Sequence, residues 1–395
     1  MATGDAAYIK KINRSLIISK IIEEKLISRA DLSKQTNLTR ATISAQAAAL
    51  LDDELIVETQ QDHSTVGRRP IMLSLNRDAG CALGIDLDYD SITFALTDLL
   101  GRPVSSRTID IETTEYEVIV RLLIENIQAY KTECANRRYG LIGIVIGIHG
   151  LVTNDEFIHF IPRFQWRDSN LKQDLEKEID LEIHLENNAN LVSFAERVYA
   201  YHETENLLCA TLYSGIGLGI MMNSEFFRGH NGYAGEAGHM IVMPGGKQCN
   251  CGNHGCWEQY ASESAFFKEL AEKKQQESVS YEDVRGWLEV QDDVVHEMME
   301  QFIYYLSIGL NNMINLYNPE ILVLNSELLR LYPKSIERMK DNLASTVSHY
   351  RELSISTLGK KACVLGAASL AIKKFLDIPT LDLTFEEKEK TMVLK

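Results

Sequence analysis

The chain has 395 residues, of which 45% are hydrophobic, so it can form two or three domains with buried cores, and a disordered protein is excluded. Four of its seven cysteines are scattered singly, which argues against a disulfide framework and favours a reducing compartment. No stretch of the sequence approaches the roughly 18 uncharged apolar residues that a membrane span requires. We therefore expect a cytoplasmic protein without a membrane partner.

The net charge of −16 argues against a nucleic-acid partner for the chain as a whole, because an acidic surface repels the phosphate backbone. This charge is unevenly distributed. Residues 1–76 contain ten Lys and Arg against nine Asp and Glu, a net charge of +1, whereas the remaining 319 residues carry −17. The N-terminal segment is therefore electrostatically distinct, and we expect a separate domain over residues 1–76.

Residues 1–76 have the pattern of a winged helix-turn-helix. Helical spacing of apolar residues predicts a helix within 8–24, an S-x-x-D cap predicts a second from Ser28, and Thr39 begins a third. Two β-prone runs, 55–59 and 71–75, flank a polar tip, which is typical of a wing. The residues expected to contact double-stranded operator DNA, in the major groove from the third helix and in the minor groove from the wing, are Arg40, Ala41, Thr42, Ser44, Ala45, Arg68 and Arg69. A small helical packing domain is the alternative.

The remainder of the chain alternates strand-like and helical segments. Residues 79–111 contain three strand-like runs, as a meander would. Residues 141–150 form a continuous apolar run that ends in glycine, as expected of a strand buried on both faces. A second strand-rich segment begins at Leu207. We therefore expect two related α/β halves with a cleft between them.

Residues 239–259 contain a cluster of potential metal ligands. Cys249, Cys251 and Cys256 fall within eight positions, and His239 lies ten residues upstream of the first. Three thiolates and one imidazole complete the tetrahedral shell of a structural Zn²⁺ site. Such a closed set leaves no coordination position for a substrate, so the ion is expected to fix geometry. Free cysteines in a loop are the alternative interpretation.

The segment "GYAGEAGHM", followed by Cys-x-Cys-Gly-x-x-Gly-Cys-x-Glu, resembles the signature of the ROK family of repressors, open reading frames and sugar kinases. The similarity covers residues 79 to about 376, and the helix-turn-helix, "GRRP", "WRD" and "CWEQYASE" are similar to the family's xylose repressor branch. The resemblance implies a two-lobed, actin-like (ribonuclease H-like) α/β fold. Its small lobe would span 77–190, completed by a C-terminal helix near 365–378, and its large lobe 191–364, with the zinc motif and a dimerisation surface.

The resemblance also implies a sugar pocket beside the zinc motif. In the family, the histidine and the glutamates of the motif face a bound sugar, and the matching sugar-binding positions here are Asn187, Asn188, Glu236, His239 and Glu258. His239 is expected to ligate zinc through one ring nitrogen and to meet a sugar hydroxyl with the other. His149 stands where relatives commonly have proline, and it either lines this pocket or packs structurally.

Most parts needed for phosphoryl transfer are replaced. After the strand that ends at Asp86, the family's Gly-Gly-Thr phosphate turn is replaced by bulky and acidic residues, 87–90, which would obstruct and repel a triphosphate. Asn188 stands in place of the catalytic aspartate, and an amide cannot accept the hydroxyl proton. "LVLNSELL", 322–329, replaces a glycine-rich nucleotide turn, whereas 214–217 is either an intact phosphate loop or a purely structural turn. We predict no enzymatic activity and no catalytic residues.

The predicted function is that of a sugar-responsive transcriptional repressor of sugar utilisation genes, with xylose or another monosaccharide as effector. Sugar binding is expected to close the cleft and release the operator. A homodimer, or a dimer of such dimers, is expected because one winged helix covers too few base pairs for specific recognition. The alternative is an ATP-dependent sugar kinase with a DNA-binding appendage, and an activator stays open.

Overall fold

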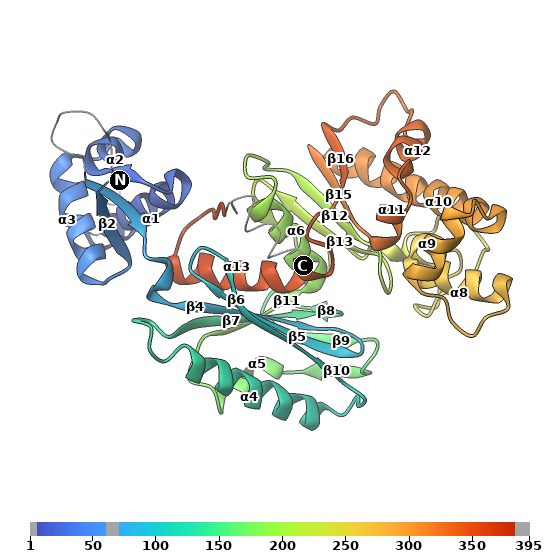
Figure 1. Cartoon of the computed structure of the whole chain (residues 1–395), viewed down its shortest axis with the longest axis horizontal. Coiled ribbons are helices and arrows are strands. Elements are labelled where there is room, and N and C mark those ends of the chain that lie inside the picture. Colours follow the sequence, from blue (N-terminus) through green and yellow to red (C-terminus); the bar gives the residue numbers. More distant parts are fainter. Residues whose placement is uncertain (1–5, 61–70, 384–395) are drawn as a thin grey trace.

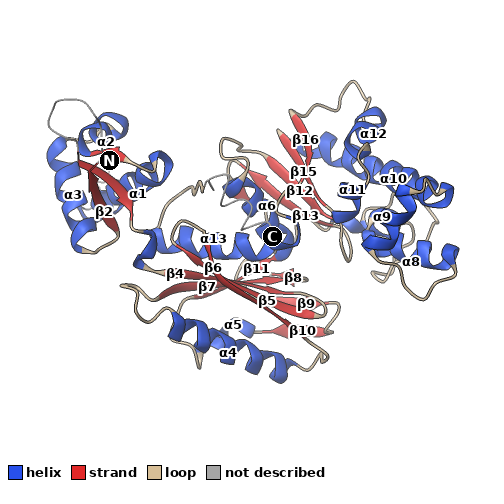
Figure 2. Cartoon of the chain, in the orientation of Figure 1, coloured by secondary structure: helices blue, strands red, loops and turns tan. Residues whose placement is uncertain are grey.

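The computed structural model describes residues 6–60 and 71–383, in which a small helical head is followed by two α/β lobes (Figures 1 and 2). The head, blue in Figure 1, lies beside the small lobe, and the large lobe lies at the opposite end of the molecule. None of the helices in the described ranges is both long enough and apolar enough to cross a membrane.

The head is a helix-turn-helix with a three-stranded sheet of order β1-β3-β2. Its elements are α1 (Ala6–Glu24), β1 (Ile27–Ser28), α2 (Arg29–Thr36), α3 (Arg40–Asp52), β2 (Ile56–Gln60) and β3 (Ile71–Leu75). The Ser28 hydroxyl accepts a hydrogen bond from the Asp31 amide at 3.1 Å, which confirms the predicted cap, and Thr39 caps α3 in the same way, where the third helix was predicted to begin. The antiparallel pair β2 and β3 confirms the two predicted wing strands.

The small lobe is built on a five-stranded sheet of order β11-β7-β4-β5-β6. Its strands are β4 (Cys81–Leu87), β5 (Ser91–Asp98), β6 (Pro103–Asp110), β7 (Leu141–Ile148) and β11 (Ile183–Asn187). The predicted meander is confirmed, because β4, β5 and β6 pair antiparallel in chain order. β7 is parallel to both β4 and β11, which accounts for the continuous apolar run of its sequence.

Helices cover both faces of this sheet (Figure 2). On one face lie α4 (Tyr116–Glu133) and α5 (Leu171–Glu176), and α4 buries Ile119, Leu123 and Ile127 at helical spacing. On the other face lies α13 (Ala362–Leu376), the C-terminal helix expected near 365–378, which contacts β4 and β7. The short strands β8 (Leu151–Val152), β9 (Ile158–Ile161) and β10 (Trp166–Ser169) form a separate small sheet.

The large lobe repeats the plan with a five-stranded sheet of order β14-β13-β12-β15-β16. Its strands are β12 (Leu207–Thr211), β13 (Gly217–Met222), β14 (Glu225–Phe226), β15 (Ile321–Asn325) and β16 (Glu352–Ile355). The helices are α7 (Glu258–Ala261), α8 (Glu263–Lys274), α9 (Tyr281–Glu289), α10 (Asp293–Tyr317), α11 (Glu327–Leu331) and α12 (Ser335–Asn342). Two mixed sheets that both begin with an antiparallel meander confirm the expected related α/β halves.

Two helices connect the lobes. α6 (Asn188–Tyr199) follows β11 and packs on β12 and β13 of the large lobe, and it also packs along α13. The two helices approach closely, because a Cβ on Gly366 would lie 2.0 Å from the carbonyl oxygen of Leu191. The small-lobe sheet, α13, α6 and the large-lobe sheet are thus in continuous contact.

The head contacts the small lobe near the C-terminal end of α13. Lys11 forms an ion pair with Asp377 at 3.0 Å, and the Tyr139 hydroxyl donates to the carbonyl of Asp53 at 2.8 Å. The ring of Tyr139 also packs edge-on against Phe375. One end of α13 therefore lies at the head, and its other end lies at the ends of β4 and β7, between the lobes.

Candidate functional site

The four predicted metal ligands come together in the large lobe. His239 Nδ1 lies 3.6 Å from Cys249 Sγ, and the Sγ atoms of Cys251 and Cys256 are also 3.6 Å apart. All four ligand atoms lie within 4.8 Å of one another. The donor types and their spacing fit one tetrahedrally coordinated ion, in which two thiolate sulfurs would lie about 3.8 Å apart. The cluster can therefore hold a metal ion.

The second ring nitrogen of His239 faces away from the cysteines. Its Nε2 lies 3.9 Å from the Glu236 carboxylate, while Nδ1 lies 3.6 Å from Glu258 Oε1. Burial raises the pKa of the Glu236 carboxyl above its ordinary range, and the neighbouring Glu258 adds to this effect. The geometry thus brings an imidazole and two carboxylates together at the edge of the metal cluster, as the sequence predicts.

A glycine turn passes between Glu258 and the start of α6. A Cβ on Gly215 would lie 2.9 Å from Glu258 Oε2, and a Cβ on Gly217 would lie 3.1 Å from the Cβ of Ala189. Side chains in this turn would therefore fill the space between the carboxylate and the helix. The backbone of the turn thus passes close to Glu258 and to α6, which glycine allows, and 214–217 stays either a phosphate loop or a structural turn.

The two predicted asparagines have different surroundings. Asn187 caps α6, since its Oδ1 accepts from the Ala189 amide at 2.9 Å and its Nδ2 donates to the Gly150 carbonyl at 3.0 Å. The side chain of Asn188 is half-buried and makes no hydrogen bond within the described ranges. Asn187 therefore positions the turn, and Asn188 is available to a ligand.

Glu186 and Arg228 are two residues of this site that the sequence analysis missed. The buried Glu186 carboxylate accepts from the Asn187 amide and from Asn190 Nδ2, each at 2.9 Å, and from Arg228 Nε at 2.9 Å. Arg228 belongs to the large lobe and Glu186 to the small lobe. For Glu186, the only signal in the sequence was its position beside the two asparagines. No signal in the sequence pointed to Arg228.

His149 lies at the other side of the site, between two carboxylates. Its Nε2 is 2.9 Å from Asp86, and its Nδ1 is 3.4 Å from Asp88. Burial opposes protonation of the ring, but the two carboxylates outweigh it and raise the pKa of His149. Both ring nitrogens face carboxylates in these pairs, so we do not assign His149 to the sugar pocket.

Tyr89 is a further residue whose role the sequence did not indicate. Its ring packs edge-on against His149 with centroids 5.7 Å apart, and its hydroxyl lies close to Ser214 of the large lobe. Burial raises the pKa of Tyr89, so the phenol stays neutral. Its position in the expected phosphate turn marked it only as an obstacle, whereas the structure makes it a contact between the lobes.

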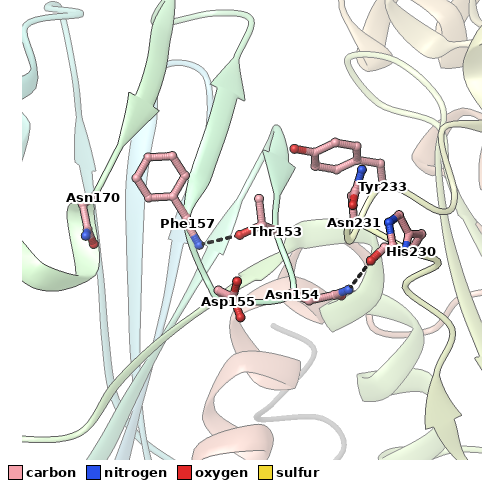
Figure 3. A pocket seen from close by; sticks show the side chains of 8 residues that line it. All are labelled: Thr153, Asn154, Asp155, Phe157, Asn170, His230, Asn231 and Tyr233. Atoms are coloured by element: carbon pink, nitrogen blue, oxygen red, sulfur yellow. Dashed lines mark hydrogen bonds between the residues drawn. The ribbon is translucent and has the colours of Figure 1, made fainter.

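A cavity of about 760 Å³ lies between the turn that joins β8 to β9 and the loop 230–233 (Figure 3). Asn154 donates to the His230 carbonyl at 2.8 Å, and the Phe157 amide donates to Thr153 at 3.1 Å. The residues that line it are Thr153, Asn154, Asp155, Phe157, Asn170, His230, Asn231 and Tyr233. Among these described lining residues there is no predicted sugar ligand.

The residues predicted to contact DNA lie at the start of α3. Arg40, Ala41, Ser44 and Ala45 are exposed, and Thr42 is half-buried with its hydroxyl 2.9 Å from that of Thr39. The opposite face of α3 buries Ile43, Ala47 and Leu50 in the core of the head. Arg68 and Arg69 lie outside the described residues.

The chain matches the model of the ROK family over residues 82–374. The xylose repressor of Bacillus subtilis is 36% identical over 386 residues, which cover 96% of this chain and 100% of that protein. A solved ROK family transcriptional regulator, a homologue of the Escherichia coli MLC protein, superposes with a TM-score of 0.80 at 26% identity and covers 93% of this chain and 97% of its own.

A solved ROK hexokinase from Thermus thermophilus superposes with a TM-score of 0.64 at 25% identity, and it covers 75% of this chain and 99% of its own. The family model, the relative and the solved structures agree on the scaffold of the two lobes. The chain therefore belongs to the ROK family.

Proposed function

We propose that the chain is a sugar-responsive transcriptional repressor that binds operator DNA, with targets among xylose-type sugar utilisation genes in the cytoplasm. The observation that carries this proposal is the extent of the similarity. A xylose repressor matches the chain over 96% of its length, head included, whereas a hexokinase matches 75%. The winged head thus belongs to the part of the chain that the repressor shares.

The proposed sugar pocket lies between the asparagine turn and the metal cluster. Asn188, Glu236, His239 and Glu258 would bind the sugar hydroxyls, and Asn187 would hold the turn in place. Carboxylates accept from adjacent hydroxyls, and a pocket built on such hydrogen bonds rejects sugars that lack one of them. We propose xylose, ahead of other monosaccharides, as the effector.

Zn²⁺ is the proposed ion of the cysteine cluster, held by His239, Cys249, Cys251 and Cys256. When bound, it supplies no chemistry beyond fixing the loop 248–256 against His239, because four protein ligands complete its shell. Ion binding would therefore matter mainly because it orients the His239 ring. With Nδ1 on the ion, the ring would be fixed with Nε2 toward the pocket.

Phosphoryl transfer is not part of the proposed function. Tyr89 occupies the first phosphate turn and contacts Ser214, and Asn188 offers no base. At the other expected nucleotide turn, the buried carboxylate of Glu263 accepts from the Ser326 hydroxyl at 2.6 Å and from the Leu328 amide at 2.9 Å. Because this buried carboxylate already accepts hydrogen bonds from these donors and carries a negative charge, it disfavours a bound phosphate at the turn.

We propose that α13 couples the pocket to the head. A sugar that draws the lobes together would change the packing of α6 on α13, and α13 ends where Asp377 meets Lys11 of the head. In a homodimer, such movement would change the spacing of the two recognition helices, α3. A coupling free energy of about 1 to 3 kcal/mol alters operator affinity roughly 5- to 150-fold.

The proposed DNA contacts are the exposed residues at the start of α3, with Arg68 and Arg69 of the wing. Small side chains at positions 41, 44 and 45 would let the helix enter the major groove, while Arg40 reaches a base edge or a phosphate. We propose that residues 1–76 form the DNA-binding unit and that the lobes, 77–190 and 191–364, carry the sugar pocket and the dimer contact.

Calorimetry with a panel of pentoses and hexoses, combined with an ATP-coupled assay on the same sample, tests this function. We expect one monosaccharide to bind with measurable heat and to be recovered unphosphorylated. Turnover at ordinary kinase rates would instead support a sugar kinase with a DNA-binding appendage. Absence of heat with every sugar would contradict the sugar response.

A further inference from the structure

Three potential metal ligands of different types meet in the small lobe, in a different lobe from the cysteine cluster. Asp86 lies at the end of β4, His149 follows β7, and Cys363 lies in the first turn of α13. One ligand atom from each lies within 4.8 Å of the other two. Asp86 and Cys363 are buried, and the His149 side chain is only 15% exposed. These residues come from three segments far apart in the sequence.

The arrangement around His149 is that of a metal-ligating histidine. Nε2 lies 2.9 Å from Asp86 Oδ1, at hydrogen-bond distance, and Nδ1 lies 3.4 Å from Asp88 Oδ1. In metal sites, a ligating imidazole typically donates its other N–H to a carboxylate, which fixes the tautomer and the ring orientation. Asp88 is placed to accept that hydrogen bond, and the ring of Tyr89 packs against the imidazole.

The backbone leaves room for the thiol at this point. A Cβ on Gly147 would lie 2.5 Å from Cys363 Sγ, so only glycine at this position allows the thiol to reach the ends of the two strands. The charge also favours a cation. Asp86 is buried and Asp88 is 41% exposed, and these two carboxylates share one imidazole, so a cation would balance the remaining negative charge.

We propose that Asp86, His149 and Cys363 form a second metal site for a divalent ion of the zinc class, with Asp88 orienting His149. A mixed set of one oxygen, one nitrogen and one sulfur ligand suits Zn²⁺, which accepts all three donors. Three protein ligands leave a fourth coordination position for water or a small ligand. The bound ion would join the ends of β4 and β7 to the start of α13.

Cobalt titration of the full-length, reduced, metal-stripped chain tests the proposal, because Co²⁺ reports thiolate ligation in its absorption spectrum. We expect the wild type to bind one equivalent at the three-thiolate cluster and a second equivalent at a single thiolate. Cys363→Ala should lose the second equivalent and keep the three-thiolate spectrum. Cys209→Ala, which removes a buried cysteine of β12 outside both clusters, should keep both equivalents.

His149→Gln provides a second variant that changes no thiol, and it decides the question if Cys363→Ala does not fold. It should also bind a single equivalent, whereas Cys251→Ser should lose the three-thiolate spectrum and keep the single-thiolate one. A wild type that binds one equivalent only would overturn the proposal. So would a second equivalent that persists in His149→Gln. Neither result depends on sugar or DNA binding, so the repressor function is tested separately.

Discussion

The site between the lobes has two ends that differ in their side chains. We call them the proposed sugar end, at Asn188 and the metal cluster, and the nucleotide end, at the expected phosphate turn 87–90. At the proposed sugar end, Gly215 and Gly217 let the backbone pass close to Glu258 and to the start of α6, and Asn188 makes no hydrogen bond within the described part of the chain. At the nucleotide end, side chains fill the corresponding turn. Tyr89 reaches Ser214, and His149 pairs with Asp86 and Asp88.

Under the proposed function, recognition and transfer are separable in this scaffold. Sugar recognition needs oriented hydroxyl partners, which the metal cluster and the α6 cap would still provide. Phosphoryl transfer needs free backbone amides and a base, and these are the parts that are occupied or changed. The contacts at the nucleotide end also connect the lobes, so they hold the lobes in position and do not bind a substrate.

The largest expected effect comes from removing the metal cluster that supports the sugar end. Cys256→Ser should abolish metal binding there and lower sugar affinity by at least about 100-fold, because His239 and the loop 248–256 lose their common anchor. Calorimetry and metal analysis measure both changes. Cys209→Ala serves as the control, and sugar affinity that survives loss of the ion would contradict the supporting role of the cluster.

A large effect on stability is expected at Glu196, a buried residue of α6 near Ser356 and Arg330. Burial raises the pKa of this carboxyl from 4.5 to about 7, and its Oε1 has no partner among the described residues. Between about pH 4.5 and 7 the folded chain holds a proton that the unfolded chain releases. The free energy of unfolding therefore falls as pH rises through this window, by about 3 kcal/mol.

Glu196→Gln removes this titration. The variant should be more stable than the wild type by about 2 kcal/mol at pH 8, once the cost of burying an amide is included, and nearly equal to it at pH 4. Urea denaturation at both pH values measures the difference. Exposed Glu203→Gln is the control. A Glu196→Gln variant that is less stable at pH 8 would show that the carboxylate has a favourable partner.

A moderate effect is expected from the sugar-facing carboxylates. Glu236→Gln should weaken sugar binding about tenfold, because an acceptor for a hydroxyl becomes partly a donor. The exposed Glu225→Gln, in β14 of the same lobe, should leave affinity unchanged. Calorimetry separates the two, and equal affinities for the variants and the wild type would place the sugar elsewhere.

A small effect is expected at the contact between head and α13. Lys11→Ala removes an ion pair whose side chains are 64% and 54% exposed, so stability should change by less than about 0.5 kcal/mol. Sugar affinity should stay constant, while the sugar-induced loss of DNA affinity should shrink about twofold. An unchanged sugar effect on DNA binding would remove this contact from the coupling path.

No effect on turnover is expected from restoring a base at the sugar end alone. Asn188→Asp supplies the missing carboxylate, but Tyr89 and the carboxylate of Asp88 still occupy the nucleotide end. A coupled ATP assay with xylose should therefore stay at background. Measurable phosphorylation by this variant would show that the nucleotide end still admits ATP.

The sequence predicted the elements whose signals are local. The S-x-x-D pattern at Ser28 predicts a helix cap, the apolar run of β7 indicates a strand covered on both faces, and the cysteine spacing is specific to a metal cluster. Contacts between distant segments left no such signal. The pairing of Arg228 with Glu186, the reach of Tyr89 to Ser214, and the meeting of His149 with Cys363 depend on how the lobes and α13 pack together. His149 in particular could not be assigned from its neighbours in the sequence.

The central claim is that sugar binding changes the affinity for DNA without chemical conversion of the sugar. Fluorescence anisotropy of a labelled duplex from the DNA upstream of the protein's own gene, titrated with the full chain, tests it most directly. We predict that xylose, or another sugar that binds in calorimetry, weakens this affinity roughly 5- to 150-fold. An affinity that no monosaccharide alters, although one of them binds, would contradict the account.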